Sequence, residues 1–196
     1  MLKERYDAAL TDERIVALAI GTRPDCIDEE RAALIASYKE RCDVWVELGL
    51  QTANDNTAKI INRGYDLSVF KDAMRILEKY GIAVVVHLII GLPEENADDV
   101  MATVDLLNGY DLFGVKLHSI YVMKGTVLED MYLRGEYTPP TKEEYISTAV
   151  RALKRLRPEF VIHRVTGDCP EGMLVAPEWN KDKNAVIAEI QRRFDE

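Results

Sequence analysis

The chain has 196 residues, 47% of them hydrophobic and 30% charged, which is enough for one domain with a sizeable core. It has no apolar run near the ~20 residues of a membrane helix, and Met1 to Arg5 carry charge where a secretion signal needs an apolar stretch. We therefore expect a cytoplasmic protein with no membrane partner. The net charge of −9 repels a phosphate backbone, so this portion gives no support for nucleic acid as a partner.

Apolar strand-like runs alternate with amphipathic helices, and no linker rich in proline, glycine or serine divides them. Strands are expected at residues 15–20, 44–51, 82–90, 115–122 and 161–165. Helices are expected at residues 2–10, 28–41, 66–81, 97–108, 141–156 and 184–194, with a short one from Asn54.

This order predicts an α/β fold, namely a partial open TIM-like barrel of parallel strands with outer helices. Five strands are too few to close a barrel. We therefore expect one domain over residues 1–196 that is truncated at the N-terminus, with the barrel portion to about 165 and a C-terminal extension over about 166–196. Residues 15–20 would then form an unpaired edge through which the chain could self-associate.

The strand at 44–51 has two chemically different faces, because side chains alternate along a strand. Val44, Val46, Leu48 and Leu50 form one face, and Trp45, Glu47, Gly49 and Gln51 form the other. The aliphatic face suits helix packing, whereas a carboxylate and an amide suit a polar cavity.

Polar side chains recur at corresponding positions of the other strands, and in such barrels the chemistry sits at the strand carboxyl ends. The candidates are Thr22 and Arg23 after the first strand, Glu47 and Gln51 on the second, His87 on the third, Lys116 and His118 on the fourth, and His163 or Arg164 on the last. Structural alternatives stay open for several of them: Glu47 could pair with a cation of a neighbouring strand, and His87 could be a core histidine. Arg63, in Asn-Arg-Gly-Tyr at 62–65, could be an exposed helix-terminal arginine.

Three motifs in register resemble the radical S-adenosylmethionine (SAM) superfamily. They are Glu-Leu-Gly-Leu-Gln-Thr at 47–52, Arg63 twelve residues after Gln51, and His-Leu-Ile-Ile-Gly-Leu-Pro at 87–93. The similar branch contains oxygen-independent coproporphyrinogen oxidase, the methylthiotransferases and the elongator acetyltransferase. Within it, the motifs at 21–26, 124–126 and 163–168 resemble a bacterial subgroup labelled Fe-S oxidoreductases.

The resemblance implies residue roles. Gln51 would hydrogen-bond the SAM ribose, Arg63 would grip the methionyl carboxylate, and His87 stands where relatives place a ribose-binding aspartate. The backbone at Ile89 would lie along the adenine edge. Thr22, Arg23 and Glu47 are assigned to the same cofactor site, and Lys116, His118, Tyr121 and Arg164 are expected to face the substrate.

Two departures from the family pattern qualify this. The cysteine triplet that ligates a 4Fe-4S cluster is absent, since Cys26, Cys42 and Cys169 stand far apart, so no metal ligands are expected in this chain. Glu94 replaces a motif glycine, while Asn96 keeps a helix cap.

The resemblance thus implies the carboxyl-terminal part of an oxidoreductase that cleaves SAM reductively to a 5′-deoxyadenosyl radical, which takes a hydrogen atom from an unidentified substrate. The cluster ligands would lie outside this chain, the fragment alone would be inactive, and a flavodoxin or ferredoxin would supply electrons. Whether tRNA is the substrate stays open.

Two other functions are carried as alternatives. One is a metal-dependent barrel hydrolase with Glu47, His87 and His118 around zinc or manganese. The other is a non-catalytic α/β binding module. A cysteine triplet in the ~100 residues upstream would favour the radical enzyme over both.

Overall fold

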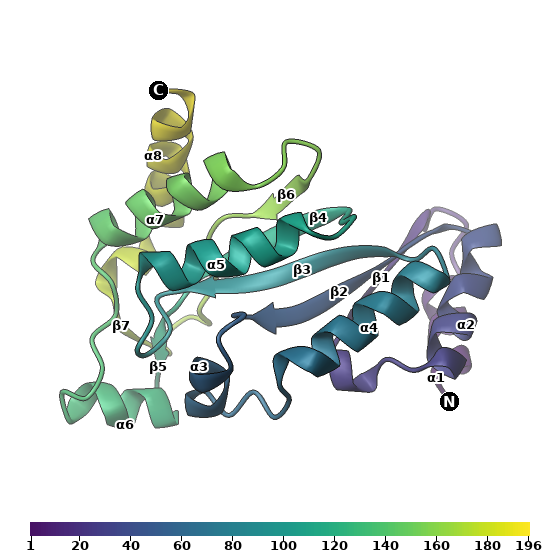
Figure 1. Ribbon diagram of the computed structural model, residues 1–196, viewed down its shortest axis with the longest axis horizontal. Helices are drawn as coiled ribbons and strands as arrows, with labels where there is room; N and C mark the ends of the chain where they lie inside the picture. The colour runs from purple at the N-terminus through teal and green to yellow at the C-terminus, as the bar shows by residue number, and fades with distance from the viewer.

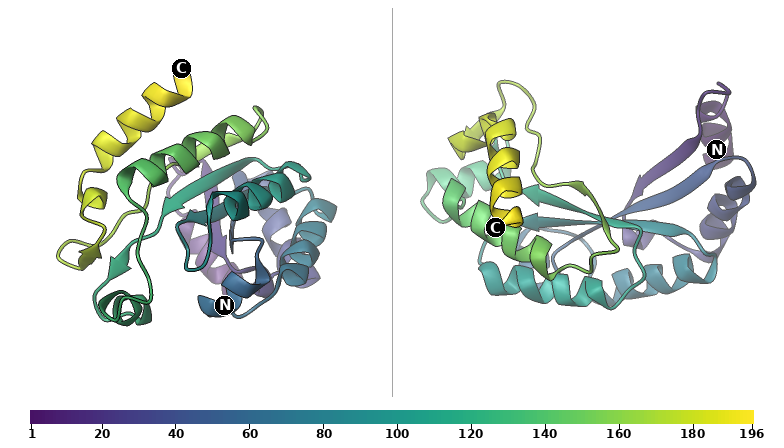
Figure 2. Two further views of the ribbon diagram at one scale, coloured as in Figure 1. Left: turned by 60° about the vertical axis from the view of Figure 1, so that its left-hand side comes forward. Right: turned by 90° about the horizontal axis from the view of Figure 1, so that it is seen from above.

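The computed structural model describes all 196 residues, and a curved five-stranded sheet dominates it (Figure 1). The strands pair in parallel in the order β1-β2-β3-β4-β6. Their bounds are Ala17–Thr22, Asp43–Gln51, Ala83–Ile90, Gly114–Ser119 and Val161–Arg164. Seen from above, the sheet and its helices form an open crescent (Figure 2). The predicted α/β partial barrel is confirmed.

The helices that connect these strands cover one face of the sheet (Figures 1 and 2). They are α2 (Glu29–Ser37), α3 (Asp55–Ile60), α4 (Leu67–Lys79), α5 (Ala97–Asn108) and α7 (Lys142–Arg155), with α1 (Leu2–Ala9) beside the start of the sheet and α8 (Lys183–Asp195) against α7. Short 3₁₀ turns η1 (Pro24–Cys26), η2 (Tyr38–Glu40) and η3 (Glu178–Lys181) complete the set.

Local side-chain chemistry sets where most helices begin. Asp28, Asn54 and Asp66 each accept hydrogen bonds from backbone N–H groups of the first helical turn. Asn96 and Thr141 form complete capping boxes at the starts of α5 and α7. These five sites are those at which the sequence predicted helix starts.

The core lies between the sheet and its helices. On β2, Val46, Leu48 and Leu50 are fully buried, whereas the alternate residues are only partly covered. The buried residues join helix residues such as Phe70 and Leu77 in a cluster of 32. Burial of each such side chain is worth ~1.5–3 kcal/mol, so the aliphatic face holds the sheet to its helices and leaves the other face free for polar groups.

The structure corrects the predicted strand at 115–122. The strand β4 ends at Ser119, and Val122–Met123 form a separate strand, β5, which pairs antiparallel with β7 (Leu174–Ala176). A hydrogen bond from the Asn180 amide to the Ile120 carbonyl helps to hold the chain where it leaves the sheet. Helix α6 (Val127–Leu133) was not predicted, and it buries no residue of its own.

The two edges of the sheet are β1 and β6. Around β1, Ala19 and Gly21 are exposed, and Val16 just before it is 73% exposed. No helix combines the length and the apolar character needed to cross a membrane.

Candidate functional site

A single cross-strand row brings three of the predicted site residues together with Gly49 on the face that the helices leave uncovered. Pairing places Gly49 of β2 opposite His87 of β3, His87 opposite Lys116 of β4, and Lys116 opposite Arg164 of β6. A register shift between Val115 and Lys116 brings Arg164 into this row. The sequence left His163 and Arg164 as alternatives, and the shift assigns Arg164 to the row.

Glu47 is the centre of the polar network. Its Oε2 atom lies 2.5 Å from Lys116 Nζ and 3.2 Å from His87 Nε2, and its Oε1 accepts from Trp45 Nε1 at 3.4 Å. Burial favours the neutral acid, but the bonds from Lys116 and Trp45 outweigh it and hold the pKa of Glu47 below its usual range. Glu47 thus pairs with a neighbouring strand's lysine, as its structural alternative anticipated, and also contacts a site histidine.

The His87 tautomer follows from this contact. Burial, and then the charge of Lys116, lower the pKa of His87, so the ring is neutral near pH 7. Because a carboxylate only accepts hydrogen bonds, Nε2 carries the proton toward Glu47. The Nδ1 atom is left as an acceptor.

The other two histidines lie on the same face. The His118 ring stacks on His87 with centroids 5.1 Å apart, and His163 packs edge-on against Phe113 at 5.3 Å. In both rings Nε2 is buried and has no hydrogen-bond partner. Burial, followed by the nearby His87, lowers the pKa of His118 to about 4, so this imidazole is also neutral near pH 7.

Gln51 ends β2 with its backbone in the left-handed region, at φ 67°. Its side chain folds over Gly49, since a Cβ atom built on that glycine would lie 2.9 Å from Gln51 Nε2. Gly49 therefore makes room for the amide on the face that carries His87. The sequence could not show this close approach, although it placed both residues on one face.

Arg63 is buried beneath the turn that follows β2. Its guanidinium donates to the carbonyls of Leu50 at 2.9 Å, Thr52 at 2.6 Å and Tyr65 at 3.0 Å, and to Asp55 at 3.1 Å. These bonds use four of its five N–H groups. Arg63 is thus neither exposed nor free for a two-pronged grip, and it lies at the same end of the sheet as His87 and Gln51.

The motif Gly-Thr-Arg-Pro lies after β1 at this end. Arg23 pairs with Asp25 through two hydrogen bonds of 2.9 and 2.7 Å, and its guanidinium lies 5.3 Å from the Tyr65 ring centroid. Arg63 lies 4.6 Å from the same centroid. Thr22 is half-buried at the end of β1. Arg23 therefore contacts the Arg63 cluster through Tyr65.

The segment after β6 is held in place by several hydrogen bonds. Tyr145 Oη donates to the Val165 carbonyl at 2.6 Å, the Gly167 amide donates to Ser119 Oγ at 2.9 Å, and Tyr121 Oη donates to the Asp168 carbonyl at 3.0 Å. Tyr121 therefore lies beyond the end of β4, beside the motif of Arg164. Ile89 stays on the inner face, opposite His118.

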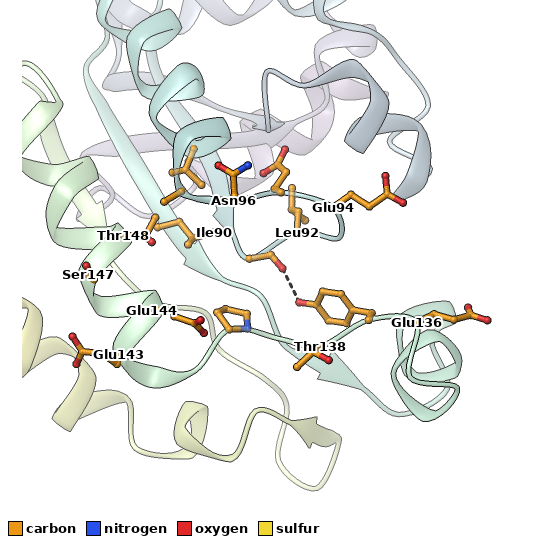
Figure 3. A pocket seen from close by; sticks show the side chains of 16 residues that line it. Ile90, Leu92, Glu94, Asn96, Glu136, Thr138, Glu143, Glu144, Ser147 and Thr148 are labelled. Atoms are coloured by element: carbon orange, nitrogen blue, oxygen red, sulfur yellow. Dashed lines mark hydrogen bonds between the residues drawn. The ribbon is translucent and has the colours of Figure 1, made fainter.

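The loop between β3 and α5 borders a cavity of about 700 Å³ (Figure 3). Its lining includes Glu94, Glu136, Glu143 and Glu144. Glu94 has φ 62°, a conformation that favours glycine. Glu95, which the sequence did not single out, accepts a hydrogen bond from Thr52 Oγ1 and so ties this loop to the turn after β2. The separation of 43 residues hides that contact from the sequence.

No three His, Cys, Asp or Glu side chains are arranged to hold a metal ion. Glu47, His87 and His118 therefore form no ready zinc or manganese site of the kind that the hydrolase alternative requires. Cys26, Cys42 and Cys169 are separate free thiols, so the cysteines of this chain do not fit a 4Fe-4S cluster.

Comparisons with known proteins agree on one family. A family model described as "Radical SAM superfamily" matches residues 1–107, and one described as "Radical_SAM C-terminal domain" matches residues 113–196. The protein MJ0486 of Methanocaldococcus jannaschii is 39% identical over 96% of this chain and 59% of its own length. YtqA of Bacillus subtilis is 33% identical over 100% of this chain and 61% of its own length. The chain thus spans about three-fifths of these relatives.

Among solved structures, Elp3 of Methanocaldococcus infernus with an N-terminal deletion matches with a TM-score of 0.74 at 25% identity. The match covers 91% of this chain and 42% of Elp3.

Proposed function

Because this chain belongs to the radical SAM superfamily, we propose that it forms the SAM-binding part of an oxidoreductase that cleaves SAM reductively. The family uses SAM and a 4Fe-4S cluster. When bound, the cluster would supply the one electron that cleaves SAM into methionine and a 5′-deoxyadenosyl radical, and that radical would take a hydrogen atom from the substrate. The cluster ligands are assigned to residues outside this chain.

The observation that carries the proposal is the placement of the Gln51 amide over Gly49 in the row of His87. The Gln51 amide offers both a donor and an acceptor to a ribose hydroxyl. His87, with Nε2 bonded to Glu47, offers Nδ1 as an acceptor. The backbone at Ile89 then borders the adenine, while Glu47 fixes the orientation of the His87 ring.

Arg63 can offer the methionyl carboxylate of SAM a single hydrogen bond and not a bidentate pair. One N–H of its Nη2 remains for the methionyl carboxylate, because the other donors hold the carbonyls of Leu50, Thr52 and Tyr65 and the Asp55 carboxylate. The carbonyls of Leu50 and Thr52 flank Gln51, so Arg63 also fixes the left-handed backbone of Gln51. Arg23 and Thr22 border the same end of the sheet.

The substrate side of the site is assigned to Lys116, His118, Tyr121 and Arg164. The reductant is assigned to a flavodoxin or ferredoxin. Relatives of 30–33% identity include tRNA uridine(34) acetyltransferases and an archaeosine synthase subunit, but the chain charge of −9 argues against RNA contact through this portion.

The assignment of Gln51 to the SAM site can be tested by isothermal titration calorimetry with SAM. The sample is protein that includes the upstream residues and has been reconstituted anaerobically. Loss of one neutral hydrogen bond is worth ~0.5–1.5 kcal/mol, so Gln51→Ala should weaken binding roughly 2- to 13-fold. Gln191→Ala on α8 is the matched control, since Gln191 bonds only to Asp195, and it should bind as the wild type does. Equal affinity of the two variants would remove Gln51 from the site.

A further inference from the structure

The inner face near β4 and β6 is cationic, in contrast to the acidic chain as a whole. Three basic side chains, Lys116 on β4, Arg164 on β6 and Lys183 at the start of α8, pair with only two carboxylates. Lys116 bonds to Glu47, while Arg164 and Lys183 both pair with Asp168, at 3.3 and 2.7 Å. One positive charge is left without a partner.

Arg164 is the cation with donors to spare. It forms an ion pair with Asp168 Oδ2 at 3.3 Å, but no hydrogen bond of its guanidinium is found in the protein. Its side chain is 39% exposed, so a ligand can reach it. A planar guanidinium with unused N–H groups is suited to bind a carboxylate or phosphate through two bonds.

His118 supplies a neutral group next to this cation. It stands two residues beyond Lys116 on β4, and Lys116 pairs with Arg164 across to β6. Its buried Nε2 atom has no partner, although buried polar atoms are nearly always hydrogen-bonded. Because that atom is closed to solvent, the His118 ring must turn for an oxygen of a bound ligand to satisfy it.

We propose that the substrate of this enzyme carries a small anionic group, a carboxylate or a phosphate, which Arg164 binds while His118 Nε2 hydrogen-bonds to it. This inference rests on the proposed function, because it places the group on the substrate side of the SAM site. A small anion fits better than a polyanion, since the surplus is a single charge on a chain of net charge −9.

The three histidines allow a direct test, because all of them, His87, His118 and His163, lie on this face. Imidazole resonances are followed by NMR while the protein is titrated with sodium phosphate, sodium malonate or sodium chloride at matched ionic strength. His118 should shift saturably with phosphate or malonate and not with chloride. A response to phosphate alone identifies a phosphorylated substrate, and a response to malonate alone a carboxylate.

Arg164→Gln should weaken this anion binding by about 10- to 150-fold, the range for hydrogen bonds to charged groups. Arg151→Gln is the matched control, because Arg151 is 52% exposed and pairs with Asp98 on the outer helices. Shifts that grow linearly and equally with chloride, or an Arg164→Gln variant that binds as the control does, would overturn the proposal. So would tRNA that binds through the same residues more tightly than phosphate.

Uncharged 5′-deoxyadenosine, added to the same samples, separates this proposal from the SAM assignment. It should shift His87 in the wild type and in Arg164→Gln alike. If His87 does not respond to 5′-deoxyadenosine while His118 still responds to anions, only the SAM site is contradicted. If His87 responds and His118 does not, only the anion site is contradicted.

Discussion

Replacement of Arg63 by alanine should destabilise the fold as well as any cofactor site. The Arg63 side chain is only 3% exposed, and it bonds to three backbone carbonyls and to Asp55. Each bond to a charged donor is worth ~1.5–3 kcal/mol, but the buried charge also loses hydration. Loss of the guanidinium also leaves the carbonyls of Thr52 and Tyr65 without this donor, at ~1–3 kcal/mol for each unsatisfied buried acceptor. With the lost bonds to Leu50 and Asp55, we expect a total loss of about 3–5 kcal/mol.

Urea denaturation followed by circular dichroism measures this loss. With a slope of about 2 kcal/mol/M, the midpoint should fall by about 1.5–2.5 M without a change of slope. Arg23→Ala is the matched control: Arg23 contacts the same Tyr65 ring but is 54% exposed, so its loss should be within about 1 kcal/mol. An Arg63→Ala midpoint equal to that of Arg23→Ala would refute the buried role.

Glu94→Gly should raise the free energy of unfolding by up to about 1 kcal/mol. The substitution removes left-handed backbone strain of ~1–2 kcal/mol at φ 62°, but glycine also increases the entropy of the unfolded chain, which offsets part of the gain. A thermal melt that shows no increase in stability would contradict this prediction. The His118 imidazole should titrate by NMR near pH 4, not near the usual ~6.5. Because the unfolded chain binds that proton at a higher pH than the folded protein does, the free energy of unfolding should fall as the pH drops from about 6.5 to 4. A His118 titration midpoint near the usual value in the folded protein would contradict this prediction. Backbone amides of residues 15–20 should exchange with solvent faster than those of 82–90 because β1 is an edge strand. Light scattering should detect self-association of the chain. A monomer in which both segments are equally protected would contradict the exposed edge.

Much of the fold could be predicted because its signals are local. Helix 97–108 has the predicted bounds, since Asn96 and Asp99 form a capping box within four residues. Period-two alternation likewise gave both faces of β2. The β5–β7 pair was missed, because it joins residues about 50 positions apart through two- and three-residue strands that carry no periodicity.

The candidate site shows the same division. Strand parity brought Glu47, His87 and Lys116 to one face, and the network between them is present. Parity allowed only one of His163 and Arg164 on this face, whereas the β4–β6 register shift brings both to it. Parity also could not show that Arg63 is buried, since an arginine near a helix end is usually exposed and its carbonyl partners become visible only in three dimensions.

We propose above that this chain holds SAM for reductive cleavage. The most direct test of this proposal is formation of 5′-deoxyadenosine from SAM by the protein with its upstream residues, loaded with iron and sulfide and reduced with dithionite without oxygen. We expect 5′-deoxyadenosine to accumulate in the wild type and to fall in Gln51→Ala, with Gln191→Ala unchanged. Protein that binds a 4Fe-4S cluster and forms no 5′-deoxyadenosine, or forms it equally in both glutamine variants, would contradict the proposal.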